Sequence, residues 1–499
     1  MKAVNFHRLA FVLSLAAALL ARLVADQVFE RLPHLEDEMA YVWQAETAAR
    51  GQLTIPSPPL TKSLFVPFVV DYHGLRFGKY PPGWPSLLAL GVLFGARDWV
   101  NPLLAALAVW LTYRLGQKIF DDRIALLSAF LTLTSPFFLL NSGSLLSHAW
   151  SLVLSLTLAL AWIDLFLPDP VPVVPSWVLT GVAGLSLGVL ALTRPLTALG
   201  VGLPFFIHGL ILLWRGAPQT RRRVLAIGLL TAAVAALLPL WQFAVTGSPW
   251  QNPYSLWWPY DRVGFGEGFG RQEGGHSLYW AWINLQNSLD AGWKDLFGWR
   301  RISWLFLPFG LCAARRNRRA WLITGVPLSL MAVYLTYWIG STLYGPRYYY
   351  EGLYSLTLLT AAGIFWPTAA TREPRLRRFL TLLVSLLTLF LVGYNLAFYQ
   401  PQRFAGMRGL YGISRRQLAP FETQAVRAAA PALFVVHPQN TWTDYGGLLE
   451  LQDPWLTSPF IFAYHRSYVR NDDLQEAFPE RRIIHYYPGR EEPFNPPLK

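Results

Sequence analysis

Long apolar segments separated by short polar turns recur along most of the 499-residue chain. A membrane-spanning helix needs about 20 mostly apolar residues. The segment at 85–96 is well under that length, so we expect it to be re-entrant or interfacial. The remaining pattern predicts a polytopic α-helical membrane protein of about eleven spanning helices, at 9–25, 100–117, 123–141, 148–167, 177–193, 197–214, 224–245, 300–314, 320–340, 350–367 and 379–397.

Charged residues are scarce and gather in the turns. They make up 14% of the chain, against about 25% in soluble domains. The net charge of +13 does not indicate nucleic-acid binding, because the arginines cluster in short turns, the pattern of cytoplasmic loops. We expect a multi-pass protein of an inner or plasma membrane with a cytoplasmic N-terminus. A cleaved signal peptide is the alternative for the first segment, although the bulky Leu23 disfavours a cut after Ala25. The arginine clusters lie at 215–223, 315–319 and 372–378.

Two polar and aromatic stretches, 26–84 and 247–299, fall on the side opposite these clusters. The first places Glu36, Asp37 and Glu38 together soon after the first apolar segment. Carboxylates in hydrocarbon must be paired or neutralised, so this acidic turn is expected in water at the membrane surface. We interpret Asp37 as a catalytic base. The alternative is a solvated turn that caps the following helix.

Residues beyond 400 lack long apolar segments. Short runs typical of buried strands alternate there with polar turns and helix-like stretches. The chain is therefore expected to comprise a transmembrane domain, 1–400, and a small extracytoplasmic α/β domain, 401–499. Strands are expected at 432–436, 459–464 and 482–487, and helices at 414–429 and 472–478.

Four short motifs, in this order and with this sidedness, carry a resemblance to a known family. They are Asp37-Glu38-Met39-Ala40-Tyr41, Lys79-Tyr80-Pro81-Pro82-Gly83, Thr193-Arg194-Pro195 and Gly345-Pro346-Arg347-Tyr348-Tyr349. Residues 1–400 resemble the GT-C glycosyltransferases, and within them the protein O-mannosyltransferase and lipid A aminoarabinose transferase group. The resemblance implies a membrane enzyme that takes a sugar from a polyprenyl-phosphate donor, with the acid of the first outer loop as base. The acceptor, a protein, lipid or glycan, is not defined by any motif.

The chemistry explains these residue types independently. An acceptor hydroxyl that attacks an anomeric carbon must lose a proton, which a positioned carboxylate accepts. Phosphate leaves as a stable anion, so one base and cationic groups suffice. Asp37 is the expected base, and Glu38 is expected to support it or to help hold a divalent cation, which is the one cofactor that the pattern allows. The donor phosphate is expected to contact outer-side cations, namely Arg347, Lys79, Arg194, Arg262 and Arg271. Substrate contacts are expected from His148, Tyr41, Tyr348 and His276.

Several of these residues have simpler interpretations. His148 stands where relatives of the aminoarabinose type carry a second acid, so a two-acid site lacks that ligand, and a buried structural imidazole is the alternative. Arg347 among tyrosines is also typical of a membrane interface. A polytopic transporter or lipid-sugar flippase is the other class of function. It would be expected to show duplicated halves and ionisable groups at mid-membrane depth, whereas the acids here concentrate in outer stretches and no repeat is visible.

Overall fold

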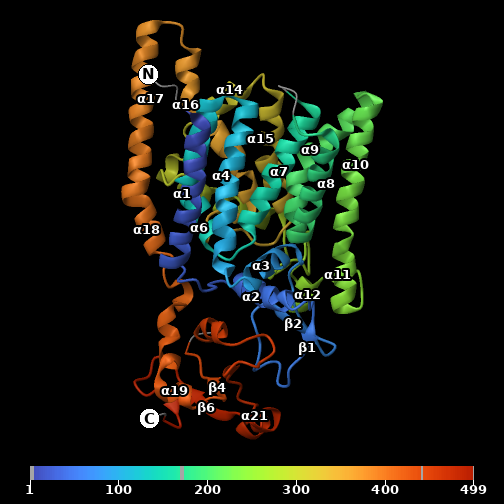
Figure 1. Ribbon diagram of the computed structural model, residues 1–499, viewed down its shortest axis with the longest axis vertical. Coiled ribbons are helices and arrows are strands. Elements are labelled where there is room, and N and C mark those ends of the chain that lie inside the picture. The colour runs from blue at the N-terminus through green and yellow to red at the C-terminus, as the bar shows by residue number, and fades with distance from the viewer. Residues whose placement is uncertain (1–4, 169–172, 440–441, 498–499) are drawn as a thin grey trace.

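Roughly parallel helices form a bundle with a small β-containing region at one end (Figure 1). The computed structural model describes residues 5–168, 173–439 and 442–497. The bundle helices are α1 Phe6–Gln27, α4 Val100–Ile119, α5 Asp122–Leu133, α6 Pro136–Gly143, α7 His148–Phe166, α8 Ser176–Thr193, α9 Pro195–Arg215, α10 Pro218–Ala235, α11 Leu237–Thr246, α14 Leu307–Ala314, α15 Arg318–Tyr334, α16 Leu353–Ala370 and α17 Pro374–Tyr394.

Seven helices of the described part of the chain are long and apolar enough to cross a membrane, and the bent pair α5 and α6, with 58° between them, makes an eighth. The other three predicted spans fold as α4, α14 and α15. They are not among these eight because α14, with 8 residues, and α15, with 17, are short, and because polar residues at both ends of α4 lower its mean hydropathy. The protein is an integral membrane protein. α7 lies at the centre of the bundle: 72% of the residues in its most apolar stretch are buried, against 11% in the stretch formed by α10 and α11.

The short apolar segment near residue 85 forms α3, Gly83–Leu93, whose 11 residues are too few to span a bilayer, as predicted. The turns that carry the arginine clusters, α9 to α10, α14 to α15 and α16 to α17, lie at the end of the bundle where α1 begins (Figure 1). α2 and the C-terminal region lie at the other end. The arginine-rich turns thus lie at one end of the bundle, as expected if successive spanning helices cross the membrane in opposite directions.

The polar and aromatic stretches at 26–84 and 247–299 are called the first and second outer stretches. The first folds as α2, Glu36–Ala49, followed by a three-stranded antiparallel sheet. Three acids occupy the first turn of α2, where negative charge stabilises a helix. The sheet has the order β1-β3-β2, with β1 Ile55–Pro56, β2 Val69–Tyr72 and β3 Leu75–Gly78.

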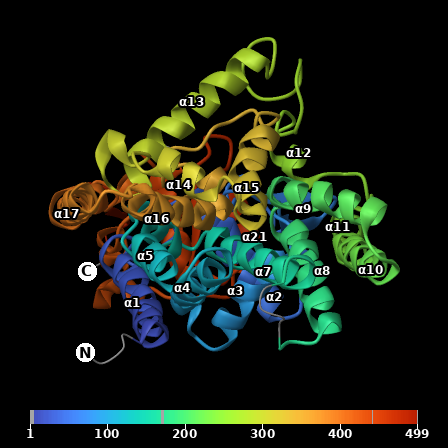
Figure 2. The same cartoon turned by 90° about the horizontal axis from the view of Figure 1, so that it is seen from above.

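The second outer stretch contains α12, Pro253–Trp257, and α13, Leu278–Asp295. Seen from above, α13 is viewed lengthwise while α1 and α17 are viewed nearly end-on, so α13 runs across the bundle direction (Figure 2). It exposes Leu278, Tyr279 and Trp282, side chains suited to a membrane surface.

The C-terminal sheet has the order β5-β4-β6-β7, with the first three strands parallel and β7 antiparallel to β6. The three predicted strands and the helix near 472 are confirmed. The single helix expected at 414–429 is wrong: 3₁₀ turns precede the short α19, because Pro420 cannot continue an α-helix. The elements are β4 Ala432–Val436, β5 Phe460–Tyr464, α21 Asn471–Ala477, β6 Arg482–Tyr486, β7 Phe494–Asn495 and α19 Gln424–Ala428.

Candidate active site

Glu38 fixes the start of α2. Its side chain is 1% exposed, and its carboxylate accepts the backbone N–H groups of His34 at 2.7 Å, Leu35 at 3.0 Å and Leu145 at 2.8 Å. The last of these bonds ties α2 to the segment that precedes α7. Both oxygens are thus occupied by backbone donors, which holds the neighbouring Asp37 in a defined position.

Asp37 lies where three distant segments meet. Its Oδ2 is 3.5 Å from a guanidinium nitrogen of Arg347, which begins the 3₁₀ turn Arg347–Gly352. Its Oδ1 accepts the hydroxyl of Tyr80, from the loop after β3. The acid of the first outer loop and the arginine of the late loop, 310 positions apart, therefore share one site.

The charges around Asp37 decide its protonation. Burial by itself would raise the pKa of Asp37, but the Arg347 guanidinium and the Tyr80 hydrogen bond outweigh it and hold the pKa below its usual value. Glu36 behaves differently, because burial and the negative charge of Asp37 raise its pKa to about 7. Two adjacent carboxyls thus differ in protonation near neutral pH, a pattern found in acid–base sites.

Lys79 is paired rather than free. Its ammonium lies 3.2 Å from Asp261 Oδ2 and 3.5 Å from the centre of the Phe68 ring. Asp261 also accepts the Tyr337 hydroxyl at 2.8 Å and the Trp338 indole N–H at 3.0 Å. Burial lowers the pKa of Lys79, and Asp261 opposes that shift. The ion pair thereby anchors the second outer stretch beside the first.

Arg194 lies between α8 and α9, where the first of these helices ends and the second begins. It is 3.2 Å from Glu351 Oε1 and donates to the Tyr334 hydroxyl at 3.2 Å. Glu351 is fully buried, and the electrostatic influence of Arg194 and Arg347 reaches both Asp37 and His148. These groups therefore form one neighbourhood.

Some buried polar atoms around this neighbourhood have no hydrogen-bond partner within the described residues. They are both ring nitrogens of His148, the Tyr344 hydroxyl and Oε2 of Glu351. Tyr41, one helical turn after Asp37, contacts the Ser147 hydroxyl at 3.4 Å. Unpaired buried polar atoms are costly, and a polar ligand with hydroxyl groups would satisfy them.

Three of the expected residues make no contact with this neighbourhood within the described part of the chain. His276 Nε2–H donates to the Leu335 carbonyl at 2.9 Å, and its ring stacks on that of Phe265 with 5.1 Å between the ring centres, so it shapes its own loop. Arg262 and Arg271 are exposed in the same loop. Sequence reasoning missed Tyr80 as a site residue, although it stands inside a quoted motif. It also missed Glu351, Tyr334 and Tyr344, which no local pattern separates from ordinary core residues.

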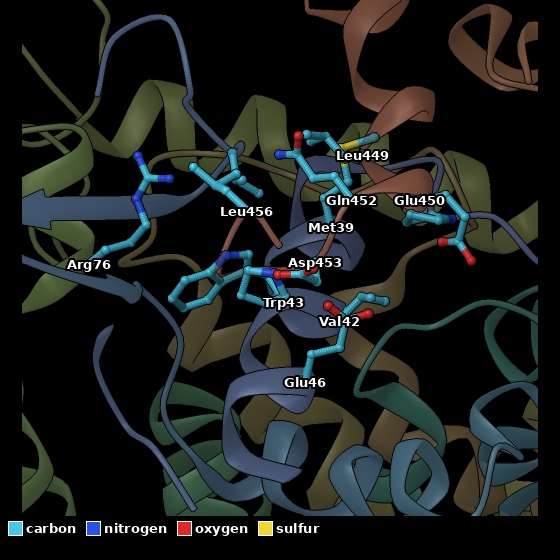
Figure 3. Close-up of a pocket in the computed structure, with 13 residues that line it drawn as sticks. Met39, Val42, Trp43, Glu46, Arg76, Leu449, Glu450, Gln452, Asp453 and Leu456 are labelled. Atoms are coloured by element: carbon cyan, nitrogen blue, oxygen red, sulfur yellow. The ribbon is translucent and has the colours of Figure 1, made fainter. Parts of the chain in front are cut away.

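The opposite face of α2 packs on the C-terminal region (Figure 3). Met39, Val42, Trp43 and Glu46 repeat at helical spacing and line a cavity of about 30 Å³. The other side of this cavity is formed by Glu450, Gln452, Asp453 and Leu456. A cavity of this size holds about one to three water molecules, and Met39 belongs to the same buried apolar cluster as residues of the C-terminal sheet, so this face is a packing contact. One helix thus carries Asp37 on one side and the C-terminal region on the other.

The acidic turn does not fit a metal ion. Across the described residues, no group of three histidine, cysteine, aspartate or glutamate side chains converges to hold one. Glu38 already accepts three backbone N–H groups. We therefore derive no step through a divalent cation.

Solved structures with the same chain path identify the fold. ArnT from Cupriavidus metallidurans, bound to undecaprenyl phosphate, aligns with a TM-score of 0.54 and 16% identity over 95% of this chain and 89% of its own. The oligosaccharyltransferase of Archaeoglobus fulgidus in the apo form aligns with a TM-score of 0.53 and 14% identity over 90% of this chain. Both are GT-C glycosyltransferases. The chain has the GT-C fold.

The expected fold is thereby confirmed, including the small C-terminal sheet region. This chain spans 64% of the length of the archaeal oligosaccharyltransferase. No protein-family model and no curated protein sequence matches it. The likeness is therefore one of architecture, and the chemistry must be argued from the residues of the site.

Proposed function

We propose that this protein is an inverting membrane glycosyltransferase that moves a sugar from a polyprenyl-phosphate donor to a hydroxyl acceptor on the extracytoplasmic side. The observation that carries the proposal is the 3.5 Å contact between Asp37 and Arg347 in a GT-C fold. It joins a carboxylate base to a cation suited to phosphate. The solved ArnT structure contains undecaprenyl phosphate, which is consistent with a donor of this class.

In the proposed reaction, the acceptor oxygen attacks the anomeric carbon and its proton passes to Asp37. The bond between the anomeric carbon and the phosphate oxygen breaks, and polyprenyl phosphate leaves with that electron pair. Attack opposite the leaving group inverts the anomeric centre. Arg347 stabilises the charge that develops on the phosphate, and Arg194 lies near enough to add to the same positive field.

The ion pair explains how donor binding prepares the base. Without donor, Arg347 lowers the pKa of Asp37 and makes it a weak base. A donor phosphate competes for the guanidinium and draws it away from the carboxylate. Asp37 then becomes a stronger proton acceptor only when the sugar is present.

The surrounding polar atoms suit the sugar. His148 and Tyr344 present buried atoms that have no partner among the described residues, which match the hydroxyl groups of a carbohydrate. Tyr41 and Tyr348 are proposed as further substrate contacts. Lys79 is assigned a weaker and longer-range part in phosphate binding because Asp261 already neutralises it. Arg262, Arg271 and His276 are proposed to act only through the fold of their loop.

The proposed orientation places the N-terminus and the arginine-rich turns in the cytoplasm. α2, the second outer stretch and residues 401–499 then face the extracytoplasmic side. The acceptor is a protein, lipid or glycan. The archaeal oligosaccharyltransferase was solved with a tethered acceptor peptide, which makes a protein acceptor the first to test.

The test uses purified protein with a panel of undecaprenyl-phosphate sugars, and it measures release of undecaprenyl phosphate. Release by the wild type and a loss of at least about 100-fold in Asp37→Asn would support the base assignment. Glu267→Gln, which removes an exposed acid of the second outer stretch, is the matched control. Movement of intact donor across proteoliposomes, with no release and no effect of Asp37→Asn, would favour a flippase instead.

A further inference from the structure

The C-terminal sheet ends in a cluster of basic and imidazole groups on the face covered by α21. Alternate residues of the three parallel strands point to this face, and most are apolar. They pack against Leu474 of α21 and comprise Leu433, Val435, Ile461 and Ala463. At the carboxyl ends of the strands, histidines take the place of such residues: His437 follows β4, His465 follows β5, and His485 lies near the end of β6.

The His437 imidazole contacts the other two. His437 Nε2 lies 2.7 Å from His485 Nδ1, so one ring donates a hydrogen bond to the other. The rings of His437 and His465 stack at 4.1 Å. Burial, aided by the two neighbouring imidazoles, lowers the pKa of His437 to about 4. Burial also lowers the pKa of His485, so at neutral pH the rings of His437 and His485 act as uncharged hydrogen-bonding groups.

A cavity of about 120 Å³ opens beside this cluster. Its lining includes His465, His485, Arg466 and Arg470. The Arg466 guanidinium lies 4.5 Å from the centre of the Tyr464 ring and donates through Nε to the Lys62 carbonyl at 3.0 Å, which fixes its position. Among the residues that the structure describes, its other N–H groups have no hydrogen-bond acceptor.

None of the described residues that line the cavity is acidic. Arg470 is paired with Asp473 of α21 at 3.3 Å, but its side chain is 76% exposed, so that pair is weak. Arg490 adds positive charge near His437. The cavity is therefore electropositive.

A buried hydroxyl also lines this cavity. Ser63, from the first outer stretch, is 2% exposed, and its Oγ has no hydrogen-bond partner within the described part of the chain. Its backbone carbonyl accepts Tyr464 N–H at 2.7 Å, which holds it against β5. A buried hydroxyl without a partner destabilises the fold, and a ligand oxygen in the cavity would satisfy it.

We propose that this cavity binds the phosphate group of a phosphomonoester. Two guanidinium groups, two imidazoles and a hydroxyl offer more hydrogen bonds than the two oxygens of a carboxylate accept, and a tetrahedral phosphate fits that number. The position agrees with the general rule for parallel sheets, in which ligands bind beyond the carboxyl ends of strands where the strand order reverses. β4 lies between β5 and β6, so its carboxyl end is such a point. This proposal does not depend on transferase activity.

The test is equilibrium binding of inorganic [³²P]phosphate to the purified full-length protein. We expect saturable binding that weakens at least about tenfold in Arg466→Gln and in Ser63→Ala. Arg482→Gln is the matched control, because Arg482 is exposed at the opposite end of the same sheet. Binding is also measured in Arg347→Ala, since the proposed donor site is a second place for phosphate. Thermal unfolding of each variant establishes that the fold is intact.

The outcomes separate cleanly. Binding that persists in Arg347→Ala and Arg482→Gln but weakens in the two cavity variants supports the proposal. Absence of saturable binding, loss in Arg347→Ala alone, or equal loss in Arg482→Gln would overturn it. Two further arms identify the source of the phosphate: glycerol 3-phosphate competes if the ligand is soluble, and phosphatidic acid vesicles, but not phosphatidylcholine vesicles, compete if it is a lipid headgroup.

Discussion

The Asp37 carboxylate and the Arg347 guanidinium lie 3.5 Å apart although 310 positions separate them in the chain. α2 supplies the carboxylate, and the turn that leads into α16 supplies the guanidinium. This ion pair gives the proposed transferase both a proton acceptor and a phosphate contact. It also makes the behaviour of each residue depend on the other, which can be tested.

Removing the Arg347 side chain should weaken binding of the donor more than binding of the acceptor. Arg347→Ala is expected to raise KM for the polyprenyl-phosphate sugar by about 10–100-fold, since a charge-assisted bidentate contact is lost. Arg347→Lys should recover only part of it, because an ammonium cannot make the same planar contact. Steady-state kinetics with each substrate varied in turn would check this. An equal rise of both KM values would contradict a phosphate contact.

The hydrogen bond from the Tyr80 hydroxyl should lower the pKa of Asp37, the proposed base. Although burial raises the pKa of Asp37, the Tyr80 hydroxyl is one of the groups that lower it. Tyr80→Phe should therefore raise that pKa and move the acidic limb of the rate profile to higher pH, since the base is lost as pH falls through its pKa. kcat should fall about tenfold or less, because one hydrogen bond contributes about 1 kcal/mol. An unchanged acidic limb in kcat/KM would remove Tyr80 from the site.

Glu36 should make stability depend on pH. Its pKa is raised by burial and by Asp37 from 4.5 to about 7 in the folded protein, so between these values the folded state retains a proton that the unfolded state releases. Stability must therefore fall as pH rises through this window. The wild type should lose more Tm between pH 5 and pH 8 than Glu36→Gln, whereas Glu267→Gln should behave as the wild type. Parallel curves for wild type and Glu36→Gln would show that the shift is absent.

Glu38 should matter for folding more than for proton transfer. Glu38→Ala leaves three backbone N–H groups without their acceptor, and the free energy of unfolding should fall by about 2–4 kcal/mol. Asp37→Asn should change it far less, since the carboxamide keeps the shape of the side chain and an oxygen acceptor. Denaturant unfolding of both variants in the same detergent provides the comparison. A stable Glu38→Ala protein that has lost all transfer would instead favour direct catalysis by Glu38.

Elements marked by strong local signals could be predicted from the sequence. The β4, β5 and β6 runs, the short α3 and the long apolar spans follow from residue spacing alone. The helix expected at 414–429 failed because its proline outweighed its composition. The order of the four motifs was enough to predict the GT-C fold.

Pairings between distant residues were harder to predict. Lys79 pairs with Asp261, 182 positions away in the chain, and Arg194 pairs with Glu351, 157 positions away. The spacing of neighbouring residues gives no indication of either pair. His276 was a candidate because long loops often carry function, yet its ring donates a hydrogen bond to the Leu335 carbonyl. The partner of a charged side chain is decided by the tertiary fold, which brings the two outer stretches together.

The two-sided use of α2 limits how this chain can be recombined. Met39, Val42 and Trp43 hold the C-terminal region on the face opposite Asp37. A chimaera that imports a foreign segment beyond residue 400 must therefore reproduce the surface that meets these three side chains. Otherwise α2 will tilt, and the carboxylate will lose its register with the guanidinium.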